Sequence, residues 1–267
     1  NISIGFDSRY NFGNIENIAL EFLYDDELEP LDYQAREVNR SDLSGLNFNF
    51  GLIYKGKINN SLDLHSSFSY SPEYNLSSRN SRVFASVIIN PNSGLELPVN
   101  EIDVDLESVG LAKTELTMPS KTNLGLGVGK DKKWFLGAEY TFLSSSVFSN
   151  DLINIDNSRF EDSSIISVGG FYIPDYSSFS GVLKRLVYRA GLYSEKSGLN
   201  INGESISEFG ISFGLGIPSG GLFSNINTTV EFGKRGTTDA NLVEENFVNF
   251  QLSLSLNDRW FIKRKYN

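Results

Sequence analysis

The chain has 267 residues, no cysteine, a single histidine (His65) and a formal net charge of −10. The lack of cysteine excludes disulfides and thiolate chemistry, and the acidic balance argues against nucleic acid as a partner. No apolar run approaches the roughly 18 residues that a transmembrane helix needs. The mean hydropathy of −0.21 also fits transmembrane β-strands, because each strand shows only half of its residues to lipid.

Apolar and polar residues alternate with a period of two along the whole chain, which predicts β-strands whose two faces meet unlike environments. Eleven segments show this alternation clearly. In chain order they are 2–6, 18–24, 46–54, 62–70, 114–129, 132–144, 163–173, 184–196, 206–217, 222–232 and 248–256. Residues 81–89 and 101–107 also alternate, and we expect them to belong to one long excursion between strands.

The connections between these segments alternate in length. The short ones are rich in Gly, Asn, Asp or Lys, as tight turns require, and comprise 12–14, 58–61, 129–132 and 218–221. The long ones are 26–43, 72–113, 145–162, 197–205 and 235–245, while 174–183 is intermediate and falls where a short turn is expected. Short periplasmic turns that alternate with long outer loops are typical of outer-membrane barrels.

The sequence therefore predicts an all-β fold, a transmembrane antiparallel β-barrel over residues 1–257. Residues 258–267 are expected to form a short basic tail or an extension of the last strand. Because the first strand is predicted to end in the turn 12–14, it would run inward from the outer face. Bacterial barrels usually have an even strand number with both ends in the periplasm. Eleven strands then need one or three more before residue 1, which gives twelve or fourteen and predicts a preceding N-terminal piece.

Several short strings resemble one known family. The strand with Met118-Pro119, the turn of residues 130–133 before Trp134, and the stretches FSNINTTVEFGKRGTT and SLNDRWFIKRKYN resemble the FadL-like family of outer-membrane transporters for long-chain fatty acids and other hydrophobic compounds. The last two look like its Bacteroidota branch. The resemblance covers about residues 40–267. It implies fourteen strands, an N-terminal hatch, location in the bacterial outer membrane and passive uptake of hydrophobic or amphiphilic molecules without a cofactor.

The polar faces of the predicted strands carry small and amide side chains and few charges. Asn47 and Asn49 lie opposite an apolar set, as do Asn249 and Gln251. In a barrel such faces line a wet interior. The alternative is a soluble β-protein with a solvated polar face, but such faces usually carry more Lys and Glu.

One part of the predicted interior mixes apolar and charged residues. The candidate ligand contacts in the lumen are Arg189, Arg185, Glu139, Phe135, Tyr193, Glu231 and Arg235. An apolar slot beside an arginine suits an amphiphile with a carboxylate head, because arginine can bind a carboxylate through two hydrogen bonds. Arg189 is the best single candidate. The alternative is that these charged residues form an ion-pair network that braces the barrel.

Catalytic motifs are weak in this chain, and we expect no enzyme. Residues 210–214 match G-x-S-x-G, but this serine lies within a predicted strand and not at a strand-to-helix turn. His65 and Ser67 share a strand face, yet the expected cross-strand partners of His65 are Ile53 or Lys55, and neither orients a catalytic histidine. The acidic run over residues 101–107 is more typical of a solvated loop than of a calcium site.

The expected partners are membrane lipids and lipopolysaccharide, a hydrophobic small molecule and other outer-membrane proteins, with no metal and no nucleic acid. The rival hypothesis is a barrel that transports nothing and serves as a subunit of a larger outer-membrane protein complex. Long loops such as 72–113 would then be docking surfaces.

Overall fold

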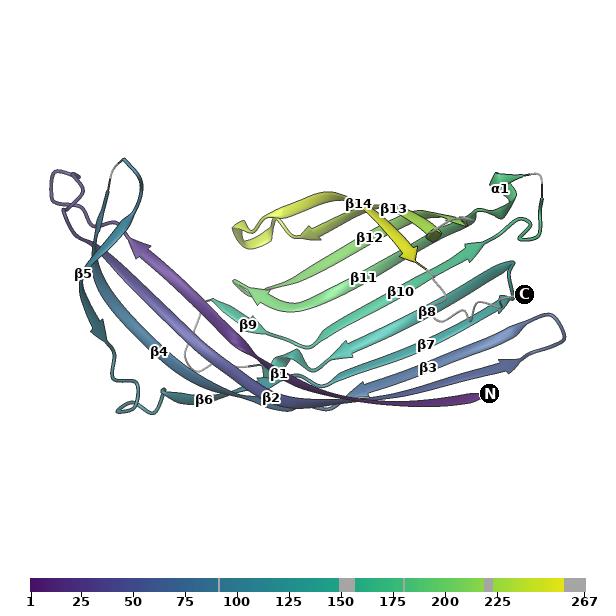
Figure 1. The fold of residues 1–267 in the computed structure, drawn as a ribbon, viewed down its shortest axis with the longest axis horizontal. Helices are drawn as coiled ribbons and strands as arrows, with labels where there is room; N and C mark the ends of the chain where they lie inside the picture. Colours follow the sequence, from purple (N-terminus) through teal and green to yellow (C-terminus); the bar gives the residue numbers. More distant parts are fainter. Residues whose placement is uncertain (91, 149–156, 180, 219–222, 257–267) are drawn as a thin grey trace, which may run out of the picture.

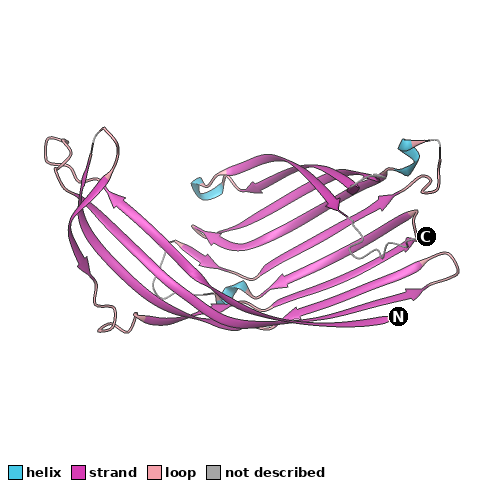
Figure 2. Ribbon diagram, viewed as in Figure 1, coloured by secondary structure: helices cyan, strands magenta, loops and turns pink. Residues whose placement is uncertain are grey.

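The computed structural model describes the whole chain except residues 91, 149–156, 180, 219–222 and 257–267. The described residues form one antiparallel sheet of fourteen strands (Figures 1 and 2). The strands are β1 (Ile2–Glu21), β2 (Gln34–Lys57), β3 (Asp63–Ser71), β4 (Tyr74–Ile89), β5 (Glu96–Asp103), β6 (Lys113–Met118), β7 (Lys121–Lys130), β8 (Trp134–Leu143), β9 (Ser158–Phe160), β10 (Ser163–Tyr172), β11 (Val187–Ile201), β12 (Glu204–Pro218), β13 (Phe223–Gly236) and β14 (Glu244–Leu256). In the described part of the chain, helical structure is limited to α1 (Val182–Arg185), η1 (Ser145–Val147) and η2 (Asp239–Asn241). None of these described helices is long enough to cross a membrane.

Ten of the strands form a continuous curved wall in the order β1-β2-β3-β7-β8-β10-β11-β12-β13-β14. Each of these strands is antiparallel to its neighbours. Within the described residues β1 pairs with β2 alone and β14 with β13 alone, so the wall curves without closing (Figure 1). The predicted all-β antiparallel fold is confirmed. The sheet has fourteen strands within this chain, where the sequence predicted eleven and placed the others before residue 1.

One face of this wall is apolar and exposed. On β2 it carries Leu46, Phe48, Phe50 and Leu52, and Phe50 lies beside Phe6 of β1 and Tyr70 of β3 in register. Only seven apolar side chains of the described residues are buried. A wall whose large apolar side chains point outward and whose protein core is this small is typical of a transmembrane barrel, in which lipid covers the apolar face.

The predicted turn at residues 12–14 is wrong. β1 runs without interruption through Phe12 and Asn14, which pair with Ser44 and Asp42 of β2. Gly13, Asn14 and Glu16 follow Phe12 and interrupt the apolar alternation of β1, which is why the sequence suggested a turn. Ile2 pairs with Tyr54, so β1 begins at the end of the sheet that holds the short β2–β3 turn. The predicted inward direction of the first strand is therefore wrong. The inference of one or three further strands before residue 1, which depended on that direction, has no basis.

The predicted long loops 26–43 and 72–113 are also largely strand. β2 begins at Gln34, and residues 34–44 pair with one edge of β4, while β5 and β6 pair with its opposite edge. We call the resulting sheet beyond the apolar band the loop-end extension; it comprises residues 13–21, 34–44, 74–89, 96–103 and 113–118. In Figure 1 it is the left-hand part of the sheet, where β4 and β5 are labelled.

Ion pairs join the strands of the loop-end extension. Arg36 lies 3.0 Å from Glu101, and Arg82 lies 3.2 Å from Glu37. These charges interrupt the apolar alternation, which is why the sequence suggested loops. Paired backbone groups and cross-strand charges nonetheless hold the segment in a sheet.

The segment 184–196 also differs from its prediction. Lys184 and Arg185 belong to α1, and β11 begins only at Val187. β11 then continues to Ile201 and forms a tight hairpin with β12, so the predicted loop 197–205 is short. The predicted tail 258–267 lies outside the described residues.

Candidate functional site

A row of glycines crosses the inner face of the wall, opposite the apolar face. Gly127, Gly137, Gly169 and Gly191 are successive cross-strand partners on β7, β8, β10 and β11. His65 of β3 continues the row on one side. Because four neighbouring positions carry no side chain, bare backbone forms a shallow floor across these strands.

Aromatic side chains lie along one side of this floor. Phe135 and Phe171 are cross-strand partners, with ring centroids 6.1 Å apart and an interplanar angle of 20°. His65 meets the Phe135 ring edge-on, at 5.6 Å. A β-carbon at Gly137 would lie 2.8 Å from the Phe135 ring, so this ring lies flat on the glycine backbone. The glycines thus allow Phe135 to cover the wall without protruding far from it.

Arg189 continues the same row, because it is the cross-strand partner of Phe171. Its Nη1 donates a 2.8 Å hydrogen bond to Oδ1 of Asn227 on β13. The guanidinium lies over Gly216 of β12, where a β-carbon would be 3.0–3.1 Å from its nitrogens. No ion pair among the described residues involves Arg189, and its side chain is exposed. This cation is therefore held in place by an amide and remains available to an anion.

A second polar cluster lies on the inner face nearer the loop end. The Tyr193 hydroxyl donates to Glu208 at 2.5 Å and to Glu231 at 3.2 Å, and Arg235 donates to Glu208. Asn249 donates to Glu231 at 3.5 Å. These contacts join β11, β12, β13 and β14 to one another. We call this cluster the tyrosine–glutamate network, and its geometry suits bracing of the wall.

The predicted site residues therefore separate into groups. Tyr193, Glu231 and Arg235 lie in the tyrosine–glutamate network, which is the arrangement that the bracing alternative expected for Glu231 and Arg235. Phe135 and Arg189 lie in the row nearer the short turns. Arg185 lies in α1 and does not share the face of Arg189, because β11 begins two residues later.

Glu139 borders a separate pocket on the inner face. The pocket has a volume of about 360 Å³ and is lined by His65, Ser67, Phe135 and Ser167 together with glycine backbone. It lies directly beside the aromatic row. Its walls combine a carboxylate, two hydroxyls, an imidazole and one ring, so it is polar on one side and aromatic on the other.

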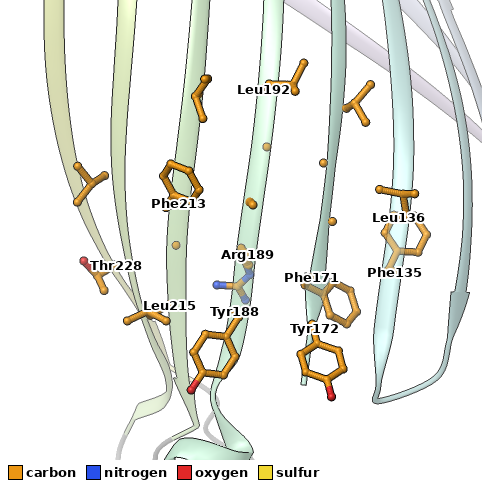
Figure 3. Close-up of a pocket in the computed structure, with 18 of the residues that line it drawn as sticks. Phe135, Leu136, Phe171, Tyr172, Tyr188, Arg189, Leu192, Phe213, Leu215 and Thr228 are labelled. Atoms are coloured by element: carbon orange, nitrogen blue, oxygen red, sulfur yellow. The ribbon is translucent and has the colours of Figure 1, made fainter. Parts of the chain in front are cut away.

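A larger hollow of about 1110 Å³ lies on the apolar face. Gly170 and Ala190, which are cross-strand partners, leave its centre without large side chains. Leu136, Tyr188 and Phe213 are among the residues around it (Figure 3). Most of its lining residues lie on the lipid-facing side, but residues of the inner-face row also border it, among them Phe135, Phe171 and Arg189.

Sequence reasoning missed Phe171, Asn227 and the glycine row. Phe171 alternates in step with its strand, but only the register shows that it lies between Phe135 and Arg189. Asn227 is 38 residues from Arg189, and the hydrogen bond crosses a whole intervening strand. The four glycines are far apart in the sequence, and their alignment depends on three strand registers.

The two catalytic-looking serine and histidine positions lie within strands, as the sequence predicted. Ser212 lies within β12 opposite Gly191, and His65 lies opposite Lys55. Within the described part of the chain, no group of three or more His, Cys, Asp or Glu side chains is placed to hold a metal ion.

The protein-family comparison finds one match: the family model described as BamG covers residues 1–267. No curated protein matches. Among solved structures, the chain is similar to the CymD monoaromatic hydrocarbon channel, with 12% identity, a TM-score of 0.47 and coverage of 88% of this chain and 64% of that one. It is also similar to a Pseudomonas aeruginosa FadL homologue, with 11% identity, a TM-score of 0.34 and coverage of 88% and 81%. The chain thus spans less than two thirds of the length of the hydrocarbon channel.

Proposed function

We propose that this chain, which belongs to the BamG family and folds as an outer-membrane barrel wall, binds an amphiphilic small molecule on the inner face of that wall. The ligand carries a carboxylate head and an apolar body. It passes inward by stepwise binding, without a cofactor and without chemical change.

The observation that carries this proposal is the position of Arg189 beside Phe171. The two side chains share the inner face as cross-strand partners, so a cation and an apolar surface lie next to each other. Arginine has five N–H donors in a planar fork, and Arg189 uses one of them for Asn227. The remaining donors can hold a carboxylate through two charge-assisted bonds.

The surroundings of Arg189 support binding of an outside anion. The neighbouring positions on β12 are Gly214 and Gly216, which present no competing carboxylate. By contrast, Arg235 in the tyrosine–glutamate network already pairs with Glu208. Of these two arginines, Arg189 is the one whose charge no other described residue neutralises.

The test is saturable binding of a fluorescent fatty acid to the purified protein in detergent. Arg189→Ala removes the guanidinium. The loss of its two charge-assisted bonds should together cost about 1.5–3 kcal/mol of binding free energy, which weakens binding about ten- to hundredfold. Arg40→Ala is the matched control, because Arg40 lies in the loop-end extension, paired with Asp42 and Glu16. The control should bind as the wild type does, and heat-modifiable gel mobility should show that both variants are folded.

A second candidate function follows from the loop-end extension. A sheet that continues well past the apolar band offers a surface to other outer-membrane proteins, so the protein would be a subunit of a larger outer-membrane complex. Native mass spectrometry of the gently extracted protein tests this candidate. Stoichiometric protein partners without a bound small molecule would favour the complex subunit over the transporter.

A further inference from the structure

The pocket of about 360 Å³ on the inner face has the carboxylate of Glu139 on its border. Glu139 lies in a row of cross-strand partners, between Gly125 of β7 and Ser167 of β10. Ser67 of β3 is the next partner in this row, and its Oγ lies over Gly125, where a β-carbon of that residue would be. The carboxylate of Glu139 therefore has a serine hydroxyl on each side.

The side of this pocket toward the short turns is aromatic. The ring of Phe135 extends along β8 toward Glu139, because it covers Gly137, which lies midway between these two residues. The imidazole of His65 meets this ring edge-on, with centroids 5.6 Å apart. A carboxylate, a ring and an imidazole thus border one small space.

The carboxylate of Glu139 has no hydrogen-bond or ion-pair partner among the residues that the structure describes. The basic residue beside the pocket is Lys55, the cross-strand partner of His65, and its Nζ lies 3.7 Å from the carboxylate of Asp63. The guanidinium of Arg189 lies over Gly216 of β12, away from this pocket. The pocket therefore carries a negative charge that no described side chain balances.

We propose that this pocket binds a primary organic ammonium ion. The ammonium group donates hydrogen bonds to the carboxylate of Glu139 and to a flanking serine hydroxyl, and the carbon chain of the ligand lies along the ring of Phe135. This site is separate from the carboxylate site at Arg189. The inference therefore goes beyond the proposed function and does not depend on it.

The walls of the pocket favour an organic ammonium ion over a metal ion. Calcium and magnesium take six or more oxygen ligands, usually with several carboxylates, whereas this pocket has one carboxylate. The face of an aromatic ring attracts an ammonium group and the carbons bonded to it. Serine hydroxyls can accept the remaining N–H donors.

The charge of the pocket favours a cation over a neutral molecule of the same shape. A carboxylate that is covered by an apolar ligand loses water, and this loss costs free energy unless the ligand supplies a donor. An ammonium group supplies that donor together with the opposite charge. The volume of about 360 Å³ is near the lower end of the usual range for ligand pockets, so the ligand is small.

The experiment measures binding of hexylammonium, hexanol and hexanoate to the purified full chain in an uncharged detergent. Isothermal titration calorimetry is carried out at neutral pH, where the amine is protonated. Hexylammonium should bind saturably and about tenfold or more tightly than hexanol, because only the cation can pair with Glu139. Hexanoate reports separately on the site at Arg189.

Three variants locate the cation. Glu139→Gln should weaken hexylammonium about tenfold or more, and Phe135→Leu about two- to fivefold. Glu195→Gln is the matched control, because Glu195 lies on the same inner face, opposite Glu208 of β12. The control should bind hexylammonium as the wild type does, and heat-modifiable gel mobility should show that all three are folded.

The outcomes separate this inference from the proposed function. If hexylammonium binds no more tightly than hexanol, the ammonium site is overturned, whatever hexanoate does. If Glu139→Gln and Glu195→Gln weaken binding equally, a general attraction to the acidic wall replaces the pocket. If only hexanoate fails to bind, the proposed function fails and the ammonium site stands. Should Glu139→Gln not fold, Glu139→Asp, which withdraws the carboxylate by one methylene, should still weaken hexylammonium severalfold, and unchanged binding would overturn the site.

Discussion

Nη1 of Arg189 on β11 lies 2.8 Å from Oδ1 of Asn227 on β13, so the arginine side chain spans the intervening strand β12. Only glycines at positions 214 and 216 make room for this crossing. The amide fixes the plane of the guanidinium without neutralising its charge. An arginine held in this way is preorganised for an anion, because little side-chain entropy remains to be lost on binding.

The first prediction concerns the glycine under this arginine. Gly216→Val should displace the guanidinium, because a β-carbon there would lie 3.0–3.1 Å from its nitrogens. We expect binding of a fluorescent fatty acid to weaken about tenfold, with folding retained. Gly5→Val adds the same side chain to the same face in open space and should leave binding unchanged. Equal binding by both variants would show that the position of Arg189 does not matter.

The second prediction concerns the apolar face. Phe50→Arg should lower the free energy of unfolding in phospholipid vesicles by about 2–4 kcal/mol if the position lies near the bilayer midplane. Phe84→Arg is the control, because Phe84 is similarly exposed but lies in the loop-end extension. Denaturant titration of both proteins measures the difference. Equal costs at the two positions would contradict the assignment of the apolar face to lipid.

The third prediction separates bracing from binding. Glu208→Gln removes the charge that accepts hydrogen bonds from Tyr193 and Arg235. Hydrogen bonds to charged groups contribute about 1.5–3 kcal/mol, and we expect a loss of stability at the low end of that range, since the Arg235 side chain is 56% exposed. Ligand binding at Arg189 should be unaffected. A variant that keeps its stability but loses ligand would place the site in the tyrosine–glutamate network.

The fourth prediction is a pH effect outside the apolar band. A hydrogen bond from Ser205 at 2.7 Å, together with contacts from Arg159 and Asn200, holds the pKa of the Glu161 carboxyl below its usual value of 4.5. A carboxyl whose folded-state pKa is lowered stabilises the fold above its unfolded pKa and loses this effect as pH falls through the folded pKa. Below about pH 4.5 the β11–β12 hairpin should therefore loosen.

Hydrogen–deuterium exchange of residues 197–206, corrected for the intrinsic pH dependence of exchange, measures this loosening. Glu161→Gln should exchange faster at neutral pH and show no further change on acidification. An identical pH profile in wild type and variant would remove Glu161 as the cause.

Alternation in the sequence was sufficient to predict the strands of the wall and their two faces. It predicted that Leu46, Phe50 and Phe213 point to the apolar side, because a period of two fixes the side of each residue once a strand is assigned. It failed where polar residues interrupt the alternation. Phe12 to Asn14 looked like a turn, and residues 34–44 looked like a loop, although pairing with a neighbouring strand holds each of them extended.

The candidate site could be predicted only in part. Phe135 was found because it breaks the polar pattern of an inner face, and Arg189 because it is a cation beside apolar residues on the predicted inner face. Phe171 and Asn227 were not, since their proximity to Arg189 depends on the registers of β10, β11, β12 and β13. Arg185 was placed on the strand because the sequence does not show that α1 precedes β11.

The most direct test of the account is the position of a bound ligand. A crystal of the protein with a fatty acid brominated at its chain end would locate the bromine by anomalous scattering. The account predicts one site on the inner face, with the carboxylate within hydrogen-bonding distance of the Arg189 guanidinium, which lies over Gly216. Bromine found only in the hollow at Gly170 and Ala190, on the apolar face, would contradict it.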